Sequence, residues 1–153
     1  GVSIGSLYQF FGNKESVVSA LIKHLIEEDR LAFFERMTPF QDLPPTDRVS
    51  KMIEIGFEIY RMKPELRSSL QSVRLYLTDH EYINQSRRLF AEFIRKNLPP
   101  ISNNRDPDKV SYIAVTAFLC IMNNAILDTP DLANDPVLAK ELTLMFKKYL
   151  EVE

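Results

Sequence analysis

The opening stretch GVSIGSLYQFFGNK carries side chains suited to binding a nucleic acid. Ser6 and Gln9 offer hydrogen bonds to phosphates or base edges, and Gly5 allows a close backbone approach. The Tyr8 ring can stack on a sugar or a thymine methyl while its hydroxyl reaches a phosphate. Lys14 lies at a predicted helix N-terminus, where its ammonium, the backbone N–H groups and the helix dipole all favour an anion.

A short helix is predicted to position these groups. Ser3 can cap a helix over residues 4–11, and Gly12 supplies its C-terminal end. Leu7 and Phe11 repeat at helical spacing and are expected to pack on neighbouring helices. The polar residues then project from the opposite side of this helix.

This stretch resembles the tetracycline-repressor (TetR) family of bacterial transcription regulators. The family pattern is G-V-S-x-G-[ST]-L-Y-x-[YH]-F, followed by a small loop and a Lys-Glu helix start. The residues in register are Gly1, Val2, Ser3, Gly5, Ser6, Leu7, Tyr8, Phe11, Asn13, Lys14 and Glu15. Phe10 replaces a frequent Tyr or His, which removes a polar phosphate contact. Ile4 stands where the family often has a polar or basic residue, so it can touch a thymine methyl but cannot read guanine.

The resemblance implies a homodimer that reads a palindromic operator. Its two recognition helices would enter successive major grooves about 34–36 Å apart. The residues expected at the DNA are Ser3, Ile4, Gly5, Ser6, Tyr8, Gln9, Phe10 and Lys14. A helix-turn-helix also needs a supporting helix before its turn, so we expect further helices ahead of Gly1. Without them this chain is not expected to bind an operator on its own.

Composition indicates a soluble globular chain in a reducing compartment, with the cytoplasm as the default location. The 153 residues are 45% apolar and carry a formal net charge of −2, which disfavours nonspecific nucleic-acid coating. The longest nearly unbroken apolar run, 112–122, is about half of what a bilayer crossing requires. Cys120 is the only cysteine, so an intrachain disulfide is impossible.

No metal, cofactor or enzymatic activity is expected. His24 and His80 lie far apart, without cysteine or acidic partners at metal-ligand spacing. The sequence has neither a glycine-rich phosphate loop nor a nucleophile elbow, and no catalytic pair stands out.

The fold class predicted is all-α, with six to seven helices. Four glycines and prolines at punctuation points delimit the helices. Beyond the first short helix, three helices are expected over 13–37, 46–62 and 80–98. Three more are expected to start at Pro64, Pro107 and Pro136, and a loop is expected at 38–46. We assign residues 1–37 to the DNA-binding region with its connecting helix, and 38–153 to an effector-binding and dimerisation domain.

The family resemblance implies that the last two helices pair with a second subunit. The helix around 110–127 is apolar on both faces, which suits burial against its own domain and a partner. The predicted interface comprises Phe118, Ile121, Ala125, Leu138, Leu142, Met145 and Tyr149. The alternative is a larger core within one chain.

The resemblance also implies a small effector bound in the body. The candidate lining is Phe57, Tyr60, Leu70, Arg74, Leu77, Phe90, Thr116, Leu119 and Asn123. Core packing is the alternative for each apolar member. Arg74 either anchors an anionic ligand end or forms a structural ion pair, and Asp29 on the long helix allows the same two interpretations.

Together these features predict a ligand-responsive homodimeric transcriptional regulator, in the first place a repressor released by a small lipophilic effector. The 13–37 helix belongs to both regions and is the expected lever between them. The alternative is a helical small-molecule-binding protein or scaffold without DNA binding.

Overall fold

The computed structural model describes residues 11–77, 79–97, 105–128 and 130–151. These residues form helices and no strand, which confirms the predicted all-α class. The helices are α2 (Lys14–Met37), α3 (Pro45–Arg61), α4 (Pro64–Leu77), α5 (His80–Asn97), α6 (Pro107–Asp128) and α7 (Pro136–Leu150), with short 3-10 helices η1 (Thr38–Phe40) and η2 (Pro130–Asn134). The short helix predicted over 4–11 falls almost wholly outside the described residues.

Local capping determines where the helices start. The Asn13 side chain accepts from the Ser16 N–H at 2.8 Å, and the Asn13 N–H donates back to the Ser16 hydroxyl at 3.3 Å. This reciprocal pair satisfies two amide donors near the start of α2. Pro64, Pro107 and Pro136 occupy first positions, where the missing N–H costs no hydrogen bond. The predicted starts at these four places are confirmed.

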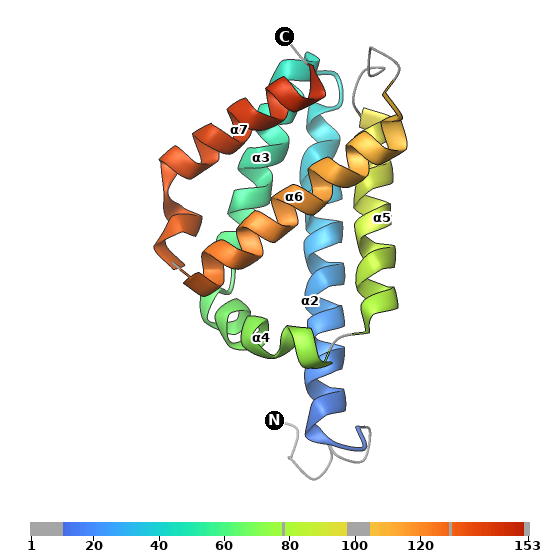
Figure 1. Ribbon diagram of the computed structural model, residues 1–153, viewed down its shortest axis with the longest axis vertical. Helices are drawn as coiled ribbons and strands as arrows, with labels where there is room; N and C mark the ends of the chain where they lie inside the picture. Colours follow the sequence, from blue (N-terminus) through green and yellow to red (C-terminus); the bar gives the residue numbers. More distant parts are fainter. Residues whose placement is uncertain (1–10, 78, 98–104, 129, 152–153) are drawn as a thin grey trace.

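The helices pack around α2, which is the longest (Figure 1). α3, α4 and α5 contact it, α6 packs mainly on α5, and α7 packs on α3. The N-terminal turns of α2 project beyond the rest of the bundle (Figure 1). Among the described residues, no helix has the length and apolar character needed to cross a bilayer.

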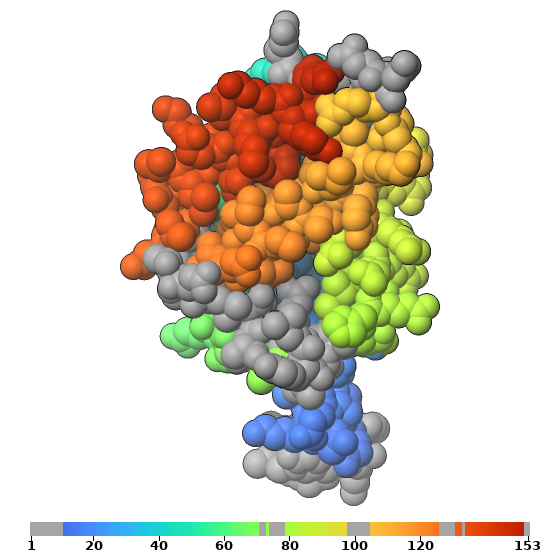
Figure 2. Space-filling model, viewed as in Figure 1, coloured from blue at the N-terminus to red at the C-terminus, as the bar shows by residue number. Residues whose placement is uncertain are grey.

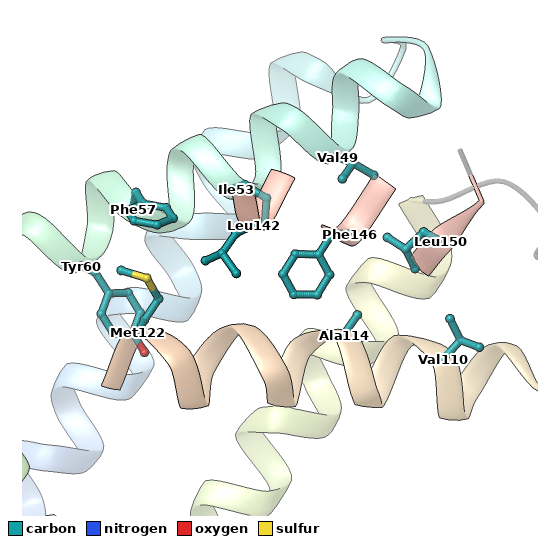
Figure 3. Close-up of a cluster of buried hydrophobic side chains, with 10 residues drawn as sticks. All are labelled: Val49, Ile53, Phe57, Tyr60, Val110, Ala114, Met122, Leu142, Phe146 and Leu150. Atoms are coloured by element: carbon teal, nitrogen blue, oxygen red, sulfur yellow. The ribbon is translucent and has the colours of Figure 1, made fainter. Parts of the chain in front are cut away.

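One apolar cluster joins α3, α6 and α7 (Figure 3). The Phe146 ring lies between α3 and α6, with Ile53 on one side and Ala114 on the other. A second cluster joins α2, α3 and α5 around Phe33 and Met37. The two clusters bury most of the large apolar side chains on both sides of α3.

Gly56 allows Phe118 to approach α3 closely. A Cβ at residue 56 would lie 2.5 Å from the Phe118 Cζ atom. The Phe118 ring also packs edge-on against Phe57 and Tyr60, with ring centroids 6.1 and 6.2 Å away. Phe118 therefore belongs to the core of its own chain.

This packing corrects part of the predicted dimer interface. Ala125 and Leu142 are 6% and 4% exposed within the single chain, so they are already covered, and Phe118 is partly buried against the same core. Ile121, Leu138 and Tyr149 are partly buried against the same core. Of the predicted interface residues, Met145 is the exposed one. The apolar faces of α6 and α7 are largely buried, as the sequence predicts, but most of the residues that cover them belong to the same chain.

Gly56→Ala is expected to destabilise the fold by up to about 2 kcal/mol, because an overpacking cost of about 1–3 kcal/mol exceeds the gain of roughly 1 kcal/mol in helix propensity. Denaturant unfolding measures this change. The same substitution in a Phe118→Leu background should cost less, since leucine vacates the space near the new methyl group. Equal costs in the two backgrounds would contradict the proposed clash.

Candidate ligand-binding cavity

A cavity of about 160 Å³ lies inside the bundle. α2 supplies Ile22, Leu25 and Phe33 to its wall, and side chains from α3 to α7 complete the lining. The surface is hollowed between α5 and α6, in yellow-green and orange (Figure 2). Apolar cavities of roughly 150 Å³ accept a molecule of about benzene size. The space is therefore sufficient for a compact organic ligand.

The structure brings together several of the predicted pocket residues. Those that line the cavity are Tyr60, Leu70, Phe90, Leu119 and Asn123. Phe57 is 1% exposed and belongs to the α3–α6–α7 core instead. Thr116 is not part of the cavity wall, although its hydroxyl is buried without a hydrogen-bond partner in the described structure. The side chains of Arg74 and Leu77 lie outside the described part of the chain.

Arg67 and Asp29 form a buried ion pair in the wall of this cavity. Two guanidinium nitrogens of Arg67 donate to the Asp29 carboxylate at 2.8 and 2.5 Å. Arg67 also donates to the main-chain oxygens of Met62 and Ile59, at 2.8 and 3.0 Å. Burial raises the pKa of Asp29, although the hydrogen bonds from Arg67 oppose this rise. Of the two interpretations of Asp29, the structural ion pair is the one observed.

Arg67 is not among the pocket residues predicted from the sequence; the arginine predicted there is Arg74, whose side chain lies outside the described residues. Arg67 precedes Leu70 by three residues, so both lie on the same face of α4. Its position on an apolar stripe was the available signal, because a charged residue there needs a buried partner.

Arg87, on α5, lines the same cavity but lacks a carboxylate partner. Among the described residues, no acidic side chain lies within ion-pair distance of it. Its Nη1 atom makes only long hydrogen bonds, at 3.4 Å to the Tyr112 hydroxyl and 3.5 Å to the Asn84 side chain. The contact with Arg87 lowers the pKa of Tyr112. The Arg87 Nε atom is buried and has no hydrogen-bond partner in the described structure.

Sequence analysis also missed Arg87. It follows Ile83 by four residues and precedes Phe90 by three, which places it on the inward stripe of α5. As for Arg67, the available sequence signal is a cationic side chain that lies on the same helix face as apolar residues.

A polar contact also bridges α3 and α6 at the cavity wall. The Tyr60 hydroxyl donates to the Asn123 side-chain oxygen at 3.3 Å. Cys120, one turn earlier on α6, also lines the cavity and is a free thiol. Within the described residues, no group of histidine, cysteine and acidic side chains has the arrangement of a metal site.

The predicted DNA-contacting residues Ser3, Ile4, Gly5, Ser6, Tyr8, Gln9 and Phe10 lie outside the described residues. Lys14 is described: it is exposed and begins α2, at the end that projects from the bundle (Figure 1). The projecting end therefore carries a cation beside a helix N-terminus.

Comparisons with protein-family models, with curated protein sequences and with solved structures find no match. The resemblance to a known family thus rests on the motif in the opening stretch alone.

Asp29→Ala is expected to destabilise the fold by about 3 kcal/mol, because it leaves the Arg67 guanidinium buried without a counter-ion. The free energy of unfolding in guanidinium chloride measures the loss. Glu54→Ala, which removes an exposed pair with Lys51, is the control and should change stability by less than about 1 kcal/mol. Similar effects of the two substitutions would show that the Asp29–Arg67 pair does not stabilise the fold more than an exposed ion pair does.

Proposed function

We propose that this chain belongs to a homodimeric, ligand-responsive transcriptional regulator of the TetR family, with the recognition helix over 4–11 and an effector-binding and dimerisation domain over 38–153. Support comes first from α2, which lines the cavity between Ile22 and Phe33 and carries Lys14 at its projecting end. This single helix connects a site that can hold a small molecule to the segment with the DNA-binding motif.

A ligand in the cavity would act on DNA binding through α2. Ile22 is eight residues from Lys14, which corresponds to about 12 Å along a helix at 1.5 Å per residue. Displacement of the cavity-lining turns is therefore transmitted to the projecting end by a rigid element. Because coupling is reciprocal, an effector that prefers the DNA-free arrangement must weaken operator binding by the same factor. The proposed role is that of a repressor released by its ligand.

Homodimerisation is part of this proposal. Large apolar side chains remain exposed on α6 and α7: Tyr112, Ile113, Val137, Leu144 and Met145. Exposed apolar groups on two adjacent helices are typical of a surface that a second subunit covers. A two-fold axis through this surface would give the partner-facing α6–α7 pair that the sequence predicted, but with different residues in contact.

A cytoplasmic location and the lack of an enzymatic activity belong to the same proposal. The cavity is equally compatible with a helical small-molecule-binding protein that does not bind DNA. DNA binding by the natural full-length protein separates the two functions.

The double substitution Tyr8→Ala/Lys14→Ala is expected to raise the operator Kd at least tenfold, since each side chain is predicted to contact phosphate. The operator is selected from random duplex DNA with the natural full-length protein and titrated by fluorescence anisotropy. Lys140→Ala, which removes an exposed cation from α7, is the control and should leave the Kd unchanged. Failure to select any duplex, or a Kd insensitive to the double substitution, would favour the protein without DNA binding.

Leu144→Glu is expected to convert the dimer to monomer at micromolar concentration, because it places a charge in the proposed α6–α7 interface. Sedimentation velocity measures the mass. Leu31→Glu is the control, since Leu31 is 53% exposed on α2, a similar exposure to the 50% of Leu144. Dimers that survive Leu144→Glu, or dissociate equally with Leu31→Glu, would locate the interface elsewhere.

A further inference from the structure

We propose that the cavity binds an amphipathic carboxylate and that Arg87 holds its charged end. This inference rests on the proposed sensor function and names the chemical class of its ligand. It starts from the different surroundings of two arginines in one cavity wall, Arg67 and Arg87.

The Arg67 guanidinium makes four hydrogen bonds to groups of its own chain, out of five N–H donors. It pairs with Asp29 and donates to two main-chain oxygens, so little capacity remains for a ligand. Its charge is balanced inside the fold. Arg67 is therefore a structural residue, and a ligand gains little from approaching it.

In contrast, neither the charge nor all the N–H donors of the Arg87 guanidinium are matched by groups of its own chain. Its Nε–H is buried without an acceptor, and its two long hydrogen bonds go to neutral side chains, Tyr112 and Asn84. A cation with a buried, unused donor is unfavourable unless an anion or acceptor completes it. Arg87 is one of the side chains that line the cavity. The missing partner is therefore expected to come from the ligand.

The remaining wall restricts the ligand to an amphiphile with one negative charge. Ile83, Phe90 and Leu119 provide apolar surface next to Arg87. The guanidinium edge matches the two oxygens of a carboxylate, and one uncompensated cation balances one charge. The volume of about 160 Å³, close to that of a cavity that accepts benzene, fits a hydrocarbon part of roughly six or seven carbon atoms.

Isothermal titration calorimetry with octanoate and octan-1-ol tests this assignment on the 153-residue chain. The two probes share a hydrocarbon chain length and differ in charge. Octanoate is expected to bind at least tenfold more tightly than octan-1-ol. Equal affinities, or no binding of octanoate, would overturn the proposal.

The variant Arg87→Gln is expected to remove the preference for octanoate while binding of octan-1-ol persists. Arg88→Gln is the matched control, because Arg88 is the next residue on α5 and is exposed. It should keep the wild-type preference. Retention of the preference in Arg87→Gln, or its loss in both variants, would assign the charge recognition to another group. The wild-type comparison of the two probes remains decisive even where a variant fails to fold.

These measurements separate the ligand proposal from the regulator proposal. Calorimetry does not depend on DNA, so a failure of operator binding leaves the octanoate result standing. Conversely, operator binding without octanoate binding retains the regulator and overturns the carboxylate ligand.

Discussion

The buried guanidinium of Arg67 is the constraint on which the arrangement of three helices depends. Arg67 lies on α4, pairs with Asp29 on α2, and donates to the main-chain oxygens of Ile59 and Met62 at the end of α3. A buried charge is tolerated only with good geometry, so these contacts restrict how the helices can meet. Because Ile59, Arg67 and Asp29 all line the cavity, the same interaction fixes part of its wall.

Packing on the other side of the cavity is governed by size rather than charge. Gly56 lets the Phe118 ring lie against α3, and Phe118 in turn contacts the ring of Phe146 from α7, at 6.4 Å between centroids. These contacts connect α3, α6 and α7 into one apolar unit. The cavity thus lies between the apolar cluster of α3, α6 and α7 and the junction of α2, α3 and α4, which the Arg67–Asp29 ion pair stabilises. Ligand-induced movement is easier to accommodate at the junction, because a few polar contacts can rearrange discretely whereas a close-packed core cannot.

Helix boundaries were predictable from sequence because their causes are local. Asn13 and the prolines at 64, 107 and 136 determine helix starts through hydrogen bonds within a few residues. Which apolar face meets which neighbour depends on tertiary contacts that a single helix does not encode. The sequence therefore predicts that Leu142 is buried but places it against a partner subunit, whereas its neighbours are in its own chain. Arg67 and Arg87 were missed because periodicity identifies a face, and only the fold reveals which charges on that face are balanced.

The contrast between Arg67 and Arg87 connects the free energy of unfolding of the chain to ligand binding. Balancing Arg87 with an acidic residue, as Asp29 balances Arg67, would remove a buried unsatisfied donor and so favour the folded chain. Leaving the donor unpaired instead sacrifices some stability at a place where an incoming anion recovers it. Ligand binding and folding are then linked, because a ligand that binds only the folded state stabilises it in proportion to RT ln(1 + [L]/Kd). On this view the cavity is a site prepared for a partner that the chain itself does not supply.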